Sequence, residues 1–419
     1  MSRNIGSTVF IVIVVLLDSM SLGLIMPVLP RLLGHLTGAG VASTATIYGS
    51  LLTTSAAMVF LFSPALGRLS DHVGRRPVLF VSLAGAMLVN ITLATANSLW
   101  LIFAAQVAGG ICGGSVLTAR AYIADVTARE KRGQAYGLLS AVFGIGLVLG
   151  PALGGFMGDV NVRMPFWAAA ALAALNLAYG IALVPESLAP ANRRPFDWRA
   201  ANPFVLLASL WRRSFLVRGL IFVAMADQLA SALARPAMIL FTQLRFSWTG
   251  SEVGAALGLL AITSFAAQAA VLPLLLQRMG QWGVILLGLV TIAASAALAS
   301  VATAGWQIYA LLAAFGLGTV AAPAMQGILS SEFSDAEQGE LQGGLVSLLT
   351  VVTIAGPLAG TGTFAFFVRA GAPIYFPGAP FVLAALLWFG ALLIVWFLYS
   401  RRAPASEAPE TPSLDNIAA

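Results

Sequence analysis

The chain has 419 residues, of which 59% are hydrophobic and only 9% are charged, and its mean hydropathy is +0.92. Soluble domains of this length carry far more charge, so the composition indicates a protein embedded in a membrane. The net charge of +6 comes mainly from arginines gathered in a few connections, which fits membrane topology better than nucleic-acid binding. With one cysteine and two histidines that share no ligand spacing, the sequence predicts neither a disulfide framework nor a metal site.

Twelve apolar segments follow one another along the chain, each of about 20 residues, which is enough to cross a hydrocarbon core of roughly 30 Å. The predicted spans are residues 8–30, 45–66, 78–97, 99–121, 135–158, 165–184, 214–241, 251–274, 283–303, 306–330, 341–368 and 377–400. Residues 1–7 are too short for the start of a cleavable leader, so the first segment is expected to be a spanning helix. The sequence therefore predicts an all-α membrane protein.

Lysine and arginine residues lie mainly in the connections on one side of this topology. If the N-terminus is inside, these connections hold Arg3, Arg68, Arg75, Arg76, Arg129, Lys131, Arg132, Arg193, Arg194, Arg199, Arg212, Arg213, Arg278, Arg401 and Arg402. The opposite connections hold only Arg31, Arg163, Arg245 and Arg369. Because basic residues concentrate in cytoplasmic loops, we expect both termini to lie in the cytoplasm.

The two halves of the chain repeat several spacings. Asp18 and Pro27 in the first span have the same spacing as Asp227 and Pro236 in the seventh. The alternative to a true repeat is chance matching of common glycines, and this Asp–Pro spacing argues against it. At another constant offset, Gly74, Gly133, Gly137, Gly150 and Pro151 recur as Gly280, Gly339, Gly343, Gly356 and Pro357. The pattern indicates a duplicated six-helix unit with a substrate site between the repeats. We expect bundles over residues 1–184 and 214–400, a cytoplasmic linker over 185–213 and a disordered tail over 401–419.

The connection between the second and third spans, Gly67 to Pro77, holds two glycines, one acid and a pair of arginines. Its order G-x-L-S-D-x-x-G-R-R resembles the loop between helices 2 and 3 of major facilitator superfamily transporters, most closely the drug/proton antiporter branch that contains the tetracycline efflux proteins. The resemblance covers helices 1 to 11 through Leu17-Asp18, Gly23–Pro30, Ala121–Asp125, Gly146–Gly155, Arg245–Trp248 and Gly339–Gly343. It implies the major facilitator fold, two pseudo-symmetric six-helix bundles, in a bacterial inner membrane.

The resemblance also implies a cytoplasmic gate, for which the matching residues are Gly67, Asp71, Gly74, Arg75, Arg76 and Asp125. In the family the loop acid, here Asp71, caps the start of helix 11. A loop arginine, here Arg75, pairs with the acid that ends helix 4, here Asp125. The helix dipole favours an acid near a helix N-terminus, so these contacts can form in one state and break in another. The alternative is a plain topology signal.

Helix 5 carries small residues at regular spacing, namely Gly146, Gly150, Pro151, Gly154 and Gly155. Glycines four residues apart leave one helical face bare, and another backbone can approach that face closely. Pro151 removes one backbone hydrogen bond and favours a kink. The resemblance implies that this helix packs against helix 8 of the other half and closes the outer side. The alternative is tight packing without a moving part.

Asp18 and Asp227 are the acids that lie deepest within predicted spans. A carboxylate at the bilayer centre costs at least about 2.5 kcal/mol, so such an acid is rarely accidental. We therefore predict that these two residues carry the coupling proton, with no cofactor other than protons. The alternative is a structural role, in which neighbouring hydroxyl groups or Arg235 satisfy the carboxylates.

Six polar residues within other spans are candidates for lining a substrate cavity: Gln106, Gln228, Arg235, Gln268, Gln326 and Gln342. Glutamines also bond helices to one another, and an arginine can extend to the outer interface instead. Tetracycline antiporters carry an arginine at the position of Gln106. They carry acids where this chain has Val89 and the neutral run Thr291–Ser295. These departures put tetracycline itself in doubt as the substrate.

Together these features predict a transporter that exports an amphipathic small molecule, a drug or tetracycline-like compound, in exchange for protons. We expect alternating access of two halves in a monomer, with a small-molecule substrate and the lipid bilayer as partners. A facilitator or importer of a polar metabolite and a non-transport membrane sensor are the alternatives. An enzyme is not expected, because the sequence has no Ser/His pair, no H-E-x-x-H and no G-x-S-x-G.

Overall fold

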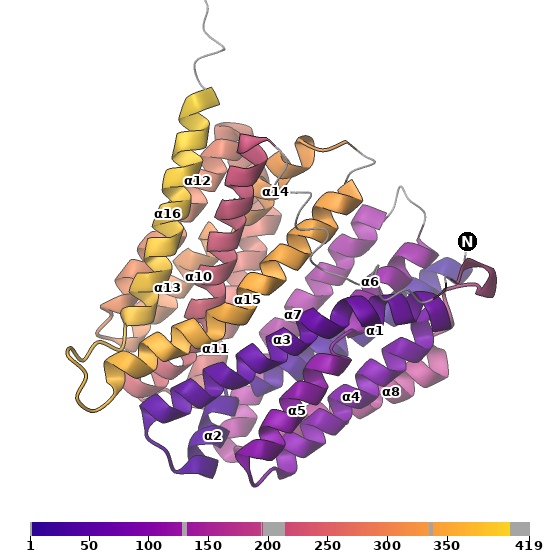
Figure 1. Ribbon diagram of the computed structural model, residues 1–419, viewed down its shortest axis with the longest axis horizontal. Coiled ribbons are helices and arrows are strands. Elements are labelled where there is room, and N and C mark those ends of the chain that lie inside the picture. The colour runs from indigo at the N-terminus through magenta and orange to yellow at the C-terminus, as the bar shows by residue number, and fades with distance from the viewer. Residues whose placement is uncertain (1, 128–131, 194, 196–213, 335–337, 403–419) are drawn as a thin grey trace, which may run out of the picture.

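The computed structural model describes residues 2–127, 132–193, 195, 214–334 and 338–402. Within these ranges all regular secondary structure is helical, as the apolar segments predict. Figure 1 shows two bundles, one from each half of the chain. Most of the predicted linker and of the predicted tail falls outside the described ranges.

The first bundle holds eight helices: α1 (Ser2–Ile25), α2 (Leu29–Thr37), α3 (Val41–Val73), α4 (Arg75–Thr95), α5 (Leu99–Cys112), α6 (Ser115–Val126), α7 (Arg132–Val160) and α8 (Met164–Leu183). The first predicted span is broken, because α1 and α2 meet at an angle of 41° across a short break that contains Pro27. The fourth is broken at Gly113 and Gly114, between α5 and α6. A short 3-10 turn, η2 (Pro190–Asn192), follows the bundle.

The second bundle holds α10 (Phe215–Phe246), α11 (Gly250–Ala266), the π-helical turn η4 (Ala267–Val271), α12 (Leu272–Ser300), α13 (Gly305–Gly318), α14 (Ala321–Ser331), α15 (Gln338–Val368) and α16 (Ala379–Arg402). The stretch Gly250–Ser300 runs on for 51 residues, far more than the roughly 20 that one crossing needs. Its helical geometry stops at Gly280, where φ is 66° and ψ is 179°. The stretch is therefore two spans, and the turn between them is shorter than the sequence predicts.

The number of spans follows from this break. By length and composition, ten of the described helices can cross a membrane, or eleven if the bent pair α1 and α2 is one span. Dividing Gly250–Ser300 at Gly280 adds one more and gives the twelve predicted spans. Gly74, the first-half counterpart of Gly280, lies between α3 and α4 with φ 114° and ψ 162°. Only glycine readily adopts this conformation, so both repeats turn on the same backbone requirement.

Apolar packing divides the described core into three clusters. One lies wholly in the first bundle around Tyr122, and another lies wholly in the second bundle around Trp388. The third mixes the two halves, bringing Leu33 together with Phe241 and Phe364. Its residues include many from α2, from the beginnings of α3 and α11, and from the ends of α10 and α15. The halves therefore share a hydrophobic core at one end of the molecule.

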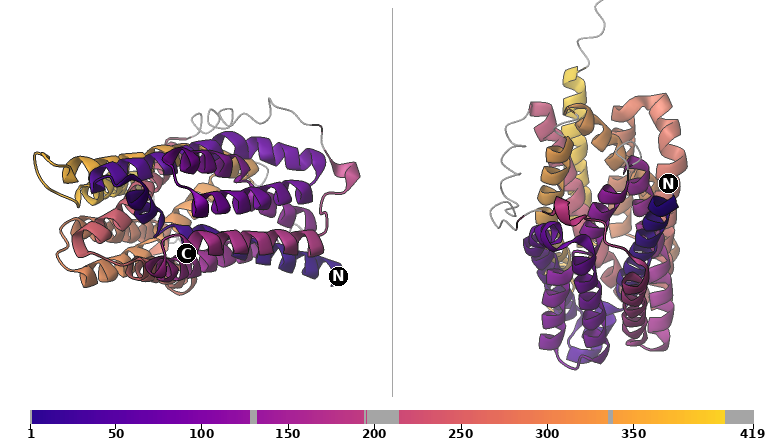
Figure 2. Two further views of the ribbon diagram at one scale, coloured as in Figure 1. Left: turned by 90° about the horizontal axis from the view of Figure 1, so that it is seen from below. Right: turned by 90° about the vertical axis from the view of Figure 1, so that its right-hand side faces the viewer.

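The helices that face each other across the two bundles separate toward the opposite end. Figure 1 shows α3 and α15 close together beside the α2 end and diverging toward the end that carries the N-terminus. In Figure 2 (right) the last turns of α16 reach beyond the neighbouring helices at that open end. By the predicted topology the closed end is the outer one and the open end is cytoplasmic.

We expect Gly280→Ala to lower the free energy of unfolding by about 1–3 kcal/mol, because a side chain strains this backbone conformation. No neighbouring atom lies within 4 Å of the added Cβ, so a clash would not contribute. Gly362→Ala is the matched control, since this glycine is equally open but lies inside α15. It should be neutral or slightly stabilising. Thermal unfolding of the purified variants tests this, and equal melting temperatures would contradict it.

Candidate functional site

Three of the glycines in α7 face α1 of the same bundle. A Cβ on Gly150 would lie 2.6 Å from the Cα of Gly23, and Gly146 and Gly154 also meet α1. Residues four apart share a helical face, and this face is turned toward the first helix. Helix 5 does pack against helix 8, as the resemblance implies, but through residues other than these three glycines. The three glycines allow close packing within the first bundle.

The neighbouring face of α7 does meet the second bundle. A Cβ on Gly254 of α11 would lie 2.9 Å from the carbonyl carbon of Pro151. A Cβ on Gly250 would lie 2.7 Å from the carbonyl oxygen of Gly155. Backbone thus meets backbone where α7 crosses α11, and Pro151 and Gly155 are the members of the predicted set that join the halves.

Asp159, near the end of α7, makes the main polar contact between the halves. Its carboxylate accepts hydrogen bonds from the backbone N–H groups of Gly250 at 2.7 Å and Ser251 at 2.8 Å, and also from the Ser251 hydroxyl. Arg31 from α2 pairs with the same carboxylate at 2.6 Å. The first N–H groups of a helix are free and carry the positive end of its dipole, so the start of α11 attracts this acid. The sequence reasoning missed this contact.

Two further hydrogen bonds cross between the halves, one farther along α3 and α15 and one at the same end as Asp159. Thr53 of α3 donates from its hydroxyl to the carbonyl oxygen of Ile354 in α15 at 2.9 Å. Gln243 near the end of α10 donates to the carbonyl oxygen of Pro27 at 3.3 Å. Together with the mixed apolar cluster, these contacts close the outer end.

The predicted cytoplasmic gate is built within the first bundle. Arg75 pairs with Asp71 at 2.6 Å through Nη1 and with Asp125 at 3.0 Å through Nε. The backbone N–H of Arg75 donates to Glu186 at 2.9 Å, and Arg76 donates to the same carboxylate at 3.2 Å. Glu186 therefore accepts from the first N–H groups of α4, just after Gly74 has turned the chain.

Among the described contacts none joins Asp71 to the start of helix 11, which is the contact that the resemblance implies. The described ion pair of Asp71 is with Arg75, one turn along the chain, and no described hydrogen bond joins Asp71 to α15. The physical reason is that α3 and α15 have separated at this end (Figure 1). Residues 335–337, just before α15, lie outside the described residues. Gly67 contributes its carbonyl oxygen, which accepts a hydrogen bond from Ser70 at 2.8 Å.

The two intramembrane acids are each held inside their own bundle. Asp18 of α1 accepts a hydrogen bond of 2.7 Å from Ser115, the first residue of α6, and only 9% of Asp18 is exposed. Asp227 of α10 accepts a bond of 2.8 Å from the indole N–H of Trp388 in α16. Each carboxylate thus has a single described hydrogen-bond donor, and the donors differ between the repeats.

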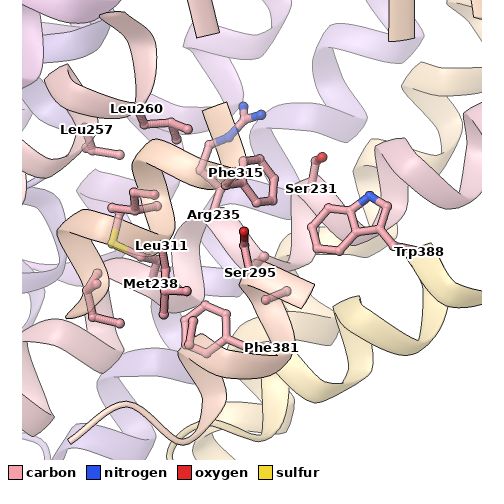
Figure 3. Close-up of a pocket in the computed structure, with 15 residues that line it drawn as sticks. Ser231, Arg235, Met238, Leu257, Leu260, Ser295, Leu311, Phe315, Phe381 and Trp388 are labelled. Atoms are coloured by element: carbon pink, nitrogen blue, oxygen red, sulfur yellow. The ribbon is translucent and has the colours of Figure 1, made fainter. Parts of the chain in front are cut away.

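A cavity of about 100 Å³ opens among α10, α11, α12, α13 and α16 of the second bundle. Figure 3 shows its lining, which is mostly apolar and includes Met238, Phe315 and Phe381. Ser295 also lines it, from the neutral run of helix 9 where tetracycline antiporters carry an acid. The cavity can receive an apolar group of a small molecule, with few polar contacts to orient it.

Arg235 is the one charged side chain that lines this cavity among the described residues. Asp227, Ser231 and Arg235 are spaced by four along α10 and share one face of it. The Arg235 side chain is exposed, and within the described part of the chain it makes no hydrogen bond or ion pair. Asp227 is its electrostatic partner. Figure 3 shows the guanidinium extending away from the apolar lining.

Four of the glutamine candidates, Gln106, Gln228, Gln268 and Gln326, are not among the described residues that line this cavity. Gln228 donates to Thr353 at 3.1 Å and Gln268 donates to Thr319 at 3.5 Å, so both bond one helix to another. Gln106 lies half-buried in α5, and Gln326 is exposed on α14. Gln342 lies in α15, but its side chain is outside the described residues.

A family model matches the chain. It is described as Major Facilitator Superfamily and covers residues 11–226. The chain is 39% identical over 352 residues to the class C tetracycline resistance protein of Escherichia coli, covering 84% of this chain and 88% of that protein. It is 36% identical over 399 residues to the class D tetracycline resistance protein of Salmonella ordonez, covering 95% and 98%.

Solved structures show the same fold. The chain is similar to the human organic anion transporter MFSD10, with a TM-score of 0.68 and 23% identity, over 94% of this chain and 99% of that one. It is also similar to the nucleoside transporter NupG, with a TM-score of 0.71 and 14% identity over the same shares. At these identities the likeness concerns the arrangement of helices alone.

We expect Asp159→Asn to open the outer end, because the amide loses about 1 kcal/mol of attraction to the start of α11 in the other half. Glu252→Gln is the control, since it removes an equal charge from the same helix start without a contact between halves. The reporter is a cysteine at Thr53, introduced after Cys112→Ala. Its labelling by an impermeant thiol reagent from outside should rise several-fold with Asp159→Asn alone. Equal labelling in both variants would remove Asp159 from the closure.

Proposed function

The chain belongs to the major facilitator superfamily, and on that basis we propose that it exports an amphipathic small molecule, a drug or tetracycline-like compound, in exchange for protons. Its similarity to tetracycline resistance proteins over most of the chain supports drug export. The proposed site of action is the inner membrane of a bacterium, with both termini in the cytoplasm and a monomer as the working unit. Its arginine distribution supports that orientation.

The observation that carries the proposal is the one-ended closure of the two bundles. Each bundle has a core of its own, and the shared cluster lies at the outer end alone among the described residues. Two rigid bodies joined in this way can rock about a site between them, which is the motion that alternating access requires. In the proposed orientation the open end faces the cytoplasm, where a drug would be collected.

Asp18 and Asp227 are the proposed proton carriers. A charged carboxylate at this depth is costly, so each acid is favoured in its neutral form whenever the site closes. Ser115 and Trp388 each donate one hydrogen bond, and such a bond can persist to a protonated carboxyl group. Protons are the only coupling ion that this chemistry needs.

The substrate is proposed to lie between the bundles, with an apolar part in the cavity of the second bundle. Arg235 and Ser231 lie at its polar border, and Phe315 and Phe381 offer aromatic faces (Figure 3). Amphipathic compounds suit such a site because most of its lining is apolar. Gln106 and Ser295 are neutral, whereas tetracycline antiporters carry charged residues in these regions. Within the drug class, this difference favours compounds other than the metal–tetracycline complex.

The test is transport in proteoliposomes with an imposed pH gradient and a panel of amphipathic drugs. We expect Asp18→Asn to bind substrate and to allow downhill exchange, but to lose uphill transport at least tenfold. The amide keeps the size and most of the hydrogen bonding of the acid while it cannot release a proton.

Asp227→Asn is the matched variant from the other repeat. Loss of uphill transport in one variant alone assigns the proton site to that repeat. Full gradient-driven transport in both variants would contradict proton coupling through these acids and favour the facilitator or importer. Absence of any flux with the whole panel would favour a membrane sensor.

A further inference from the structure

A second hollow, outside the cavity and the gates, lies along the packed helices α10 and α16. We call it the α10–α16 groove, and its volume is about 510 Å³. Its lining includes Phe215, Arg218 and Phe222 from α10 with Leu393 and Phe397 from α16. It lies at the beginning of α10 and the end of α16, which is the end that the topology places at the cytoplasm.

The groove faces lipid and not the transport pathway. Phe215, Phe222 and Leu393 are 54%, 46% and 49% exposed. On the other side of α10, Leu220 and Ala224 are buried in the core of the second bundle. Large apolar side chains on an outward face at this depth are solvated by hydrocarbon, so an acyl chain is the natural neighbour of the groove.

Two arginines lie at the polar end of the groove. The guanidinium carbon of Arg401 lies 4.6 Å from the centre of the Phe397 ring and 6.0 Å from the centre of the Phe215 ring. Arg218 lines the groove, and its side chain makes no hydrogen bond or ion pair with any residue that the structure describes. The residues that line the groove include no acid. Positive charge therefore gathers where the helices leave the membrane, without a carboxylate among the described residues that line the groove.

We propose that the α10–α16 groove binds an anionic phospholipid. The phosphate lies against Arg218 and Arg401, and an acyl chain follows the apolar lining past Phe222 and Leu393. Guanidinium groups form two parallel hydrogen bonds to phosphate, and basic pockets between membrane helices on the cytoplasmic side suit anionic headgroups. The rings beneath Arg401 hold its guanidinium at the mouth of the groove.

A competing occupant is the part of this chain that precedes α10 in the sequence, residues 196–213. That segment contains Arg199, Arg212 and Arg213. Placing it on the groove would bring like charges toward Arg218 and Arg401, whereas a phosphate would neutralise them. Charge complementarity therefore favours the lipid.

The test uses the full chain in detergent, with phosphatidylglycerol as the anionic probe and phosphatidylcholine as the neutral one. Native mass spectrometry counts the bound lipid, and thermal unfolding measures the stabilisation. We expect phosphatidylglycerol to bind and to raise the melting temperature, with little effect of phosphatidylcholine. In Arg218→Gln/Arg401→Gln the affinity for phosphatidylglycerol should fall about fivefold for each arginine removed.

Arg369→Gln is the matched control, because Arg369 stacks on Phe366 at 4.3 Å at the opposite end of the bundle. This variant should keep the full response to phosphatidylglycerol, and Arg218→Lys/Arg401→Lys should keep most of it. An equal response to both lipids, or an unchanged response in the double glutamine variant, would overturn the proposal. A wild-type protein that binds neither lipid would do so too, and would favour residues 196–213 as the occupant.

Discussion

The carboxylate of Asp159 in the first half of the molecule binds the start of α11 in the second half, and the closure of the outer end depends on this contact. On one side it pairs with Arg31, and on the other it accepts the free N–H groups at the start of α11. Close backbone contact at Gly155 and the mixed apolar cluster surround it. The backbone contact and the carboxylate depend on each other. When α7 packs this closely on the start of α11, the first N–H groups of α11 need an acceptor, and Asp159 provides it. Opening the outer end must break the contacts that cross to the second bundle, while the pair of Asp159 with Arg31 stays within the first bundle.

The polar contacts of the two intramembrane acids and of the predicted gate stay within one bundle. Asp18 and Ser115 move together, as do Asp227 and Trp388, and Arg75 keeps Asp71, Asp125 and Glu186 on the first bundle. Rocking the halves would leave these groups intact, so the acids can change protonation without a change of hydrogen-bond donor. The free energy that separates the two states therefore depends mainly on the outer contacts.

Much of the fold was predictable because a bilayer imposes span length and repeated turns need glycine. Hydropathy gave the twelve spans, and the matched Gly74 and Gly280 have matching backbone conformations. The roles of Asp159 and Glu186 were not predicted, because an acid near a helix end is usually a solvated surface charge. Both carboxylates here accept hydrogen bonds from backbone N–H groups, which every residue except proline has, so the sequence does not identify the partners. The bare face of Gly146, Gly150 and Gly154 indicated close packing but not which helix would approach. The indole donor to Asp227 comes from the last span, far along the chain, and no local spacing points to it.

The central claim is that transport requires the outer end to open. A pair of cysteines at Thr53 and Ile354, introduced after Cys112→Ala, would join α3 to α15. At this point the Thr53 hydroxyl now lies 2.9 Å from the backbone carbonyl oxygen of Ile354. Substrate flux is then measured in proteoliposomes before cross-linking with a short thiol reagent, after it, and after reduction. The account predicts that the cross-linked protein still binds substrate from the cytoplasmic side but does not carry it across, and that reduction restores transport. Undiminished flux through the cross-linked protein would contradict it.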